Sequence, residues 1–188
     1  TVMDAIQVIL YGSFSPSFLN KAADDAKNRR SVLSYLRGEQ KDGSANRKDC
    51  DFCSVIALEI EDTGTHIITC IGIAFEVRKS DSEIKKFVYF SHSGKMPESE
   101  YLTEQGVCYS NQEIKKLVSA RTKSDDNRGK GEVNRIYGSK EAYLGTLYDV
   151  ILGYIDQNRF ITMEKSAIAL KMTNGTGQFI RDYMFPKN

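Results

Sequence analysis

The sequence predicts a single α+β domain over residues 1–188, in which a largely antiparallel sheet with a central β-meander packs against two or three helices. Two observations carry this prediction. Segments with strand-like patterns come in a block between helical segments, whereas a doubly wound parallel fold would alternate the two kinds of segment. The strongest helical pattern, at residues 139–158, carries a broad apolar stripe, which is typical of a helix that packs against a sheet.

The N-terminal segment predicts one strand followed by helix. Residues 5–11 form an apolar run, which we interpret as a buried strand. Ser15 and Pro16 then suit the N-cap and the first position of a helix. Apolar residues at helical spacing continue to Leu36, so we expect one long helix or two shorter helices that end at Gly38.

The middle of the chain predicts the meander. Segments 53–61 and 65–78 alternate apolar and polar residues, and the turn at residues 62–64 joins them into a hairpin. Segment 84–92 supplies a third strand after another turn. The polar segment 39–49 precedes this block, and its glycine, serine and asparagine residues indicate a mobile loop.

A capping box marks the next helix. Ser110 is followed three residues later by Glu113, which predicts a helix that continues to about residue 122. Segment 123–137 is charged and glycine-rich and has no periodicity, so we expect a second mobile loop there. Ser139 is the expected N-cap of the long helix.

The sequence predicts extended structure in the C-terminal part of the chain. Residues 160–163 and 167–172 have strand-like patterns. Asn174 and Gly175 are a strong signal for a tight hairpin turn. We therefore expect residues 178–185 to return as the last strand, with a short helix as the alternative.

Composition excludes several classes of protein. The 26 basic and 25 acidic side chains give a net charge of +1, with 40% apolar and 27% charged residues, as in ordinary soluble domains. This balance excludes a coiled coil, a collagen-like chain, a disordered chain and a protein that is strongly basic throughout. No apolar run reaches the roughly 18 residues that would predict a membrane span, so we expect no membrane partner.

Catalytic motifs are absent from the sequence. A P-loop, a Rossmann glycine pattern, H-E-x-x-H and G-x-S-x-G do not occur. We therefore expect no cofactor and lean against an enzyme. His92, at the end of the third predicted strand, is the candidate acid–base residue because histidine most often moves protons in catalysis. The alternative is a solvated polar residue at a strand end.

The spacing of the cysteines is compatible with a metal site. Cys50, Cys53, His66 and Cys70 have the spacing of a zinc site, and a strand would place His66 and Cys70 on one face. We favour the alternative that the cysteines are core or half-buried residues without a metal. A chain of this length does not depend on disulfides, and with Cys108 the four thiols favour a reducing, cytoplasmic compartment. Secretion after removal of a leader stays open.

Basic residues gather in segment 115–135, where they could contact phosphate groups. The candidates are Lys115, Lys116, Arg121, Arg128, Lys130 and Arg135. Acidic residues are interspersed among them, so a solvated surface is the alternative.

These observations favour a binding function. We expect a non-enzymatic recognition module that binds a protein or a small ligand through the loops 39–49 and 123–137, because long loops in compact domains often carry function. The alternative is a nucleic-acid-binding or RNA-processing protein, which would use segment 115–135 on phosphates and His92 as an acid–base residue.

Overall fold

The computed structural model describes residues 2–14, 31–40, 42–124 and 133–168. Its elements follow one another as α1 (Val2–Tyr11), α2 (Val32–Arg37), β1 (Phe52–Glu61), β2 (Ile68–Val77), β3 (Lys86–Ser93), α3 (Asn111–Ser124), β4 (Arg135–Tyr137), α4 (Lys140–Gly145), the π-helix η3 (Thr146–Ile151) and α5 (Gln157–Ile168). In this part of the chain, no helix combines the length and apolar character needed to cross a bilayer.

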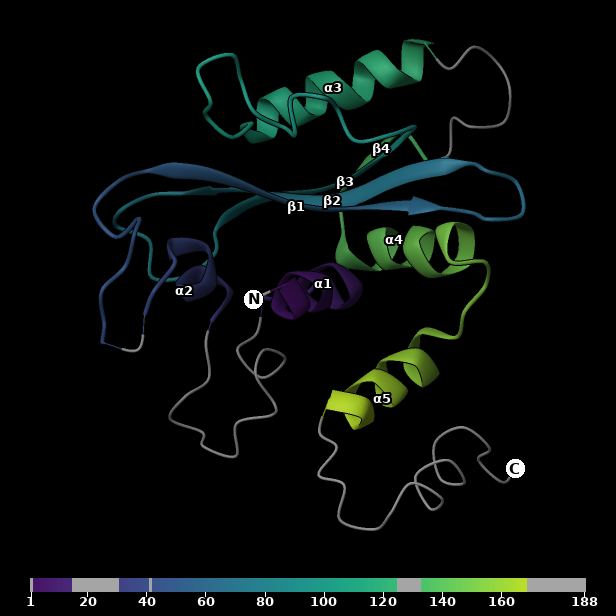
Figure 1. The fold of residues 1–188 in the computed structure, drawn as a ribbon, viewed down its shortest axis with the longest axis horizontal. Helices are drawn as coiled ribbons and strands as arrows, with labels where there is room; N and C mark the ends of the chain where they lie inside the picture. Colours follow the sequence, from purple (N-terminus) through teal and green to yellow (C-terminus); the bar gives the residue numbers. More distant parts are fainter. Residues whose placement is uncertain (1, 15–30, 41, 125–132, 169–188) are drawn as a thin grey trace.

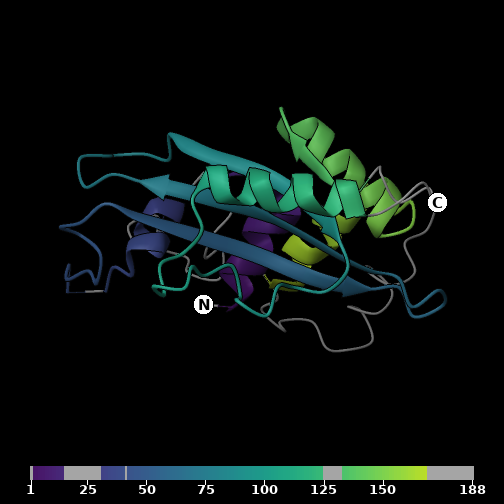
Figure 2. The ribbon, with the colours of Figure 1, turned by 90° about the horizontal axis from the view of Figure 1, so that it is seen from above.

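The strands form one antiparallel sheet in the order β1-β2-β3-β4. The predicted α+β class, the hairpin and the third strand are confirmed. α3 covers one face of the sheet, and α1 and α4 cover the other (Figure 1). Seen from above, α3 runs along the sheet and lies over its strands (Figure 2). β4 falls inside the segment expected to be a loop, because three residues are too few to show an alternating pattern.

Alternation along β2 builds a hydrophobic core on each face of the sheet. Ile71, Ile73 and Phe75 point to the face of α1 and α4, where they join the larger core. Ala74 points to the opposite face and packs in a smaller core with Ile114 of α3. The central strand is therefore buried on both faces, which is why its apolar run is nearly continuous.

The first element is a helix, so the strand predicted at residues 5–11 is wrong. A short apolar run does not distinguish a buried strand from a buried helix, because both lack a polar face. α1 lies between the sheet and α5 (Figure 1), and Val8 and Ile9 are fully buried. Gln7 also faces inward, and its amide donates to the Glu164 carboxylate of α5 at 3.0 Å.

Three tyrosine hydroxyls satisfy the carbonyl groups at the buried C-terminus of α1. Tyr143 of α4 donates to the carbonyl of residue 9 at 3.1 Å, and Tyr148 of η3 donates to that of residue 10 at 2.9 Å. Tyr89 of β3 donates to the Gly12 carbonyl at 2.6 Å. Gly12 itself has a φ of 53°, the left-handed conformation that glycine adopts readily after a helix. Side-chain donors thereby pair carbonyl groups that a helix end leaves without partners in the helix.

α2 ends at Gly38, as predicted, with Gly38 in the left-handed conformation. The segment that contains Ser15 and Pro16 lies outside the described residues. Ser31 is the N-cap of α2, and its hydroxyl accepts from the Ser34 amide at 3.0 Å. The N-terminal helical pattern therefore ends in a short, separately capped helix.

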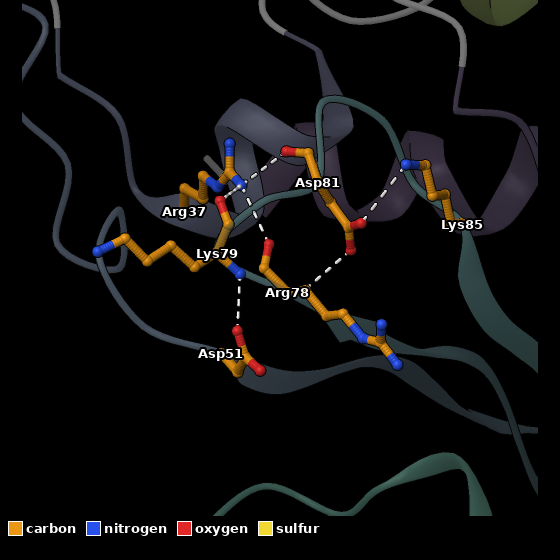
Figure 3. A network of polar contacts seen from close by, with 6 residues as sticks. All are labelled: Arg37, Asp51, Arg78, Lys79, Asp81 and Lys85. Atoms are coloured by element: carbon orange, nitrogen blue, oxygen red, sulfur yellow. Dashed lines mark hydrogen bonds and ion pairs between the residues drawn. The ribbon is translucent and has the colours of Figure 1, made fainter.

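Arg37 fastens α2 to the turn between β2 and β3 (Figure 3). Its guanidinium donates to the carbonyls of Arg78, Lys79 and Asp81 at 3.3, 3.1 and 2.8 Å. The Asp81 carboxylate accepts from the Arg78 amide, and Asp51 accepts from the Lys79 amide, each at 2.8 Å. All three carbonyl oxygens lie within hydrogen-bond distance of one nitrogen, Nη2. This end of the sheet is closed by polar contacts.

The capping box at the start of α3 is confirmed. The Glu113 carboxylate accepts from the Ser110 amide at 2.7 Å, and the Glu113 amide donates back to the Ser110 hydroxyl at 3.3 Å. α3 continues to Ser124, close to the predicted end.

The long helix predicted at residues 139–158 begins correctly at its N-cap Ser139 but ends early. The chain leaves the helix after Ile151, and Gly153 and Tyr154 both take positive φ values, of 73° and 63°. A new helix, α5, then starts at residue 157, so the extended structure predicted at residues 160–163 is wrong. Tertiary contacts of Phe160 with Tyr148 override the local pattern.

The remaining C-terminal predictions fall mostly on residues that the structure does not describe. Residues 167 and 168 belong to α5, so the extended segment expected from residue 167 is wrong at its start. The turn at Asn174 and Gly175 and the strand at residues 178–185 lie outside the described residues.

We expect Tyr89→Phe to lower the free energy of unfolding by about 1–3 kcal/mol, because the Gly12 carbonyl would stay buried without its donor. Urea unfolding measures this difference. Tyr154→Phe is the matched control, because Tyr154 is 86% exposed and should change stability little. Equal stabilities of Tyr89→Phe and the wild type would contradict the role of this hydroxyl.

Candidate functional site

A pocket opens at the end of the sheet where β1 turns into β2 and where β3 ends. It has a volume of about 580 Å³, within the range of small-molecule sites. The β1–β2 turn, the start of β2, the end of β3, the segment before β4 and the end of η3 form its walls. The lining residues are Ile60, Asp62, Thr65, His66, Ile67, Ile68, Thr69, Ser93, Gly94, Lys95, Val133, Val150 and Ile151.

The pocket exists because the helical layer stops short of the end of the sheet. If the helix continued to residue 158, as predicted, its apolar stripe would cover the strand ends. Instead η3 ends at Ile151, and Val150 is 49% exposed at the pocket wall. Ile67, on the facing turn, is 45% exposed. Two apolar side chains thus face solvent across a concave surface.

η3 is a π-helix, whose turns are wider than those of an α-helix. π-helical turns are rare and occur frequently at functional sites. Here the π-helix places Tyr148 inward on α1 and Val150 and Ile151 at the pocket. One short element therefore joins the buried core to the candidate site.

Polar groups in the pocket come from the strand ends and from the β1–β2 turn. Thr69 and Ser93 are directly paired across β2 and β3, and both line the pocket. Lys95 follows β3 and is exposed, with no ion pair to any residue in the described ranges. Among the described residues that line the pocket, Lys95 is the single lysine or arginine. A ligand would meet the hydroxyl groups of Thr65, Thr69 and Ser93 and the ammonium group of Lys95 beside apolar walls, with Asp62 and His66 in the turn.

The Asp62 side chain forms hydrogen bonds within its own turn. Its carboxylate accepts from the amides of Thr65 and Gly64 at 3.0 and 2.8 Å, and these hydrogen bonds lower the pKa of Asp62 below its ordinary value. The Asp62 charge thereby stabilises the turn that carries the pocket wall.

His66 lies in this turn and not in a strand, so the expectation that it shares a strand face with Cys70 is wrong. Its φ of 56° is uncommon for a residue other than glycine, although histidine adopts this conformation more often than most residues. The Nδ1 atom lies 3.0 Å from the Glu61 carboxylate. Both side chains are exposed, so the pair is solvent-screened.

His92 is buried and not solvated. It is 0% exposed, its Nδ1 lies 2.9 Å from the Ser93 carbonyl, and its Nε2 lies 2.8 Å from the Tyr101 hydroxyl. The carbonyl only accepts, so Nδ1 donates, and neutral Nε2 accepts from Tyr101. Burial lowers the pKa of His92, with nearby Arg121 acting in the same direction. His92 does not line the pocket, and its contacts are those of a structural residue.

The four cysteines are free thiols that the structure does not bring together with His66. Cys53 pairs with Glu76 near one end of the β1–β2 hairpin, and Cys70 pairs with Glu59 near the other. Within the described ranges, no group of three or more histidine, cysteine or acidic side chains is placed to hold a metal. Burial raises the pKa of Cys70 to about 11, so its thiol stays protonated.

The predicted phosphate-binding residues are divided between different surfaces. Lys115 and Lys116 are exposed on α3. Arg121 is partly buried, with its guanidinium close to Gly94. Arg135 of β4 lies over the Tyr137 ring, on the sheet face opposite α3. The two other candidates, Arg128 and Lys130, lie outside the described residues.

A scan against protein-family models matches no family to this chain, and searches of curated proteins and of solved structures find no match either. Function therefore has to be inferred from the chemistry of the site itself.

Apart from His66 and the residues within the loop 123–137, the pocket residues are not among those predicted from the sequence to form a site. The topology of the meander could have indicated some of these pocket residues. In an antiparallel meander, the segment after the third strand lies at the same end as the first turn, so Lys95 should lie close to Asp62. The contribution of Val150 depends on where the helix ends, which the local pattern does not reveal.

We expect acid to destabilise the protein through His92. Its folded pKa lies below the value of about 6.5 for an unfolded histidine, so the unfolded state binds the proton first. The contribution is complete above that value and is lost as the pH falls toward the folded pKa. Urea unfolding between about pH 8 and pH 5 should show a shallower pH dependence for His92→Gln than for the wild type.

The control for this experiment is His66→Gln, because His66 is exposed. This variant removes the other histidine and leaves His92 in place. A wild-type slope in His92→Gln would show that the buried imidazole does not carry the effect.

Proposed function

We propose that this protein is a recognition module that binds a small ligand in the pocket at the open end of the sheet. The observation that carries the proposal is the pocket itself, where the paired residues Thr69 and Ser93 and the ammonium of Lys95, which has no ion pair within the described residues, adjoin apolar walls. Mostly apolar pockets with a few placed polar groups are the usual form of small-molecule sites.

The lining favours a ligand with an apolar body and an anionic head. Ile60, Ile67 and Val150 offer the body a hydrophobic surface, and Lys95 offers the head a positive charge. The Asp62 carboxylate, which also lines the pocket, accepts from two backbone amides of its own turn and forms no ion pair with Lys95 within the described residues.

One of the two expected contact loops reaches this pocket. Segment 123–137 contains Val133, which lines the pocket. Segment 39–49 lies at the other end of the sheet, where the carboxylate of Asp49 pairs with Lys79 at 3.5 Å. We therefore assign ligand contact to the end of the sheet near Val133.

Binding of phenylacetate and naphthoate tests the proposal, because each joins an aromatic body to a carboxylate. We expect Lys95→Met to weaken binding by about tenfold, the loss of one charge-assisted contact. Lys48→Met is the matched control, because Lys48 is exposed near the start of β1, at the far end of the sheet. Calorimetric titration gives the affinities. No binding to the wild type, or equal loss in both variants, would contradict the proposed site.

A second candidate function is nucleic-acid binding at the outer face of α3. It is favoured by a shallow hollow lined by Lys115, Lys116 and Lys123 together with Gln112 and Ser119. Binding to phosphates would release counterions, so affinity for duplex DNA should fall by about 0.9 logarithmic units per contact for each tenfold rise in salt. Titration at several salt concentrations measures this slope, and salt-independent binding would exclude this mode.

A further inference from the structure

A second hollow lies over the α3 face of the sheet, separate from the ligand pocket. It is a groove of about 860 Å³ between α3 and the segment that follows β3. The groove is open along its length and mainly apolar. Its lining residues are Ser99, Leu102, Thr103, Glu104, Gln105, Gly106, Tyr109, Glu113, Lys116, Leu117 and Ala120.

The loop wall of this groove is held in a fixed shape by Tyr101. Glu100 and Tyr101 have consecutive positive φ values of 51° and 60°, which non-glycine residues rarely adopt. The surrounding structure offsets this strain, because Tyr101 is buried and donates to His92. The Tyr101 carbonyl also accepts from the Tyr109 amide at 2.8 Å. The wall is therefore formed before any partner binds, which lowers the entropic cost of association.

The residue after Tyr101 faces the groove. Leu102 lines it and is 38% exposed, although it follows a fully enclosed tyrosine. Leu117 and Ala120 of α3 lie on the opposite wall, and Tyr109 completes the apolar lining. A leucine that is left partly exposed on a rigid wall offers a partner side chain a contact without rearrangement.

The charges beside the groove indicate the partner. Glu104 lines the groove, Glu98 and Glu100 are exposed in the same loop, and within the described ranges none of the three forms an ion pair. On the facing wall, the Glu113 carboxylate is engaged with Ser110, and Lys116 supplies one positive charge. The loop side is thus acidic and has free acceptors for lysine or arginine side chains.

We propose that this groove docks a basic amphipathic peptide segment of a partner protein. Apolar side chains of the segment fill the space between Leu102 and Leu117, and its lysine or arginine side chains pair with the acidic loop at Glu98, Glu100 and Glu104. Docking of an amphipathic segment into an apolar groove is a common mode of peptide recognition. Its opposite charge also directs the segment onto the loop wall.

Fluorescence anisotropy with two labelled peptides tests this docking. One peptide repeats leucine and lysine at helical spacing, and the other carries glutamate in place of each lysine. The lysine peptide should bind the wild type and the glutamate peptide should not. Leu102→Glu should weaken binding of the lysine peptide by about tenfold, because it places a charge on the apolar wall. Glu104→Lys should weaken it at low salt and much less at high salt.

Two control variants separate docking from general effects. Val107→Glu introduces the same charge in the same loop, at an exposed residue that does not line the groove. Glu141→Lys makes the same charge reversal on α4, which lies on the other face of the sheet (Figure 1). Both should bind the lysine peptide like the wild type. No binding to the wild type, equal binding of both peptides, or equal loss in Leu102→Glu and Val107→Glu would overturn the proposal.

Discussion

The packing of α1, α4 and η3 against the sheet depends on one constraint, the need to pair the carbonyl groups at the buried end of α1. A helix end that is shielded from water must find donors for its last carbonyl groups, because unpaired buried carbonyls are costly. Tyr89, Tyr143 and Tyr148 supply these donors from β3, α4 and η3. One requirement for hydrogen bonds thereby fixes the position of α1 relative to three elements that are distant in sequence.

The two ends of the sheet are covered differently. Tyr148 ties η3 to α1, and the chain turns away at Gly153 before it covers the ends of β2 and β3. That end stays open as a pocket. At the other end, Arg37 binds three carbonyls of the β2–β3 turn and closes the gap between α2 and the sheet (Figure 3). We therefore infer that the open end is the place for a ligand and the closed end serves stability.

Features with a local cause could be predicted from the sequence. The capping box at Ser110 and the left-handed Gly38 depend on neighbouring residues alone, and the hairpin follows from alternation and a turn. The burial of His92 could not be predicted, because it depends on Tyr101 from a later loop. Likewise, the apolar run of α1 is compatible with strand or helix until its tertiary partners are known. The pocket could not be predicted from the sequence for the same reason, because its shape depends on where η3 ends.

The most direct test of this account is a methyl NMR spectrum of the protein with increasing amounts of an aryl carboxylic acid, because the pocket is rich in isoleucine and valine. Our account predicts shifts at the methyl groups of Ile60, Ile67 and Val150, whereas the core residues Ile73 and Val8 stay unchanged. Shifts confined to methyl groups outside the pocket, or spread evenly over the molecule, would contradict the assignment of the open sheet end as the binding site.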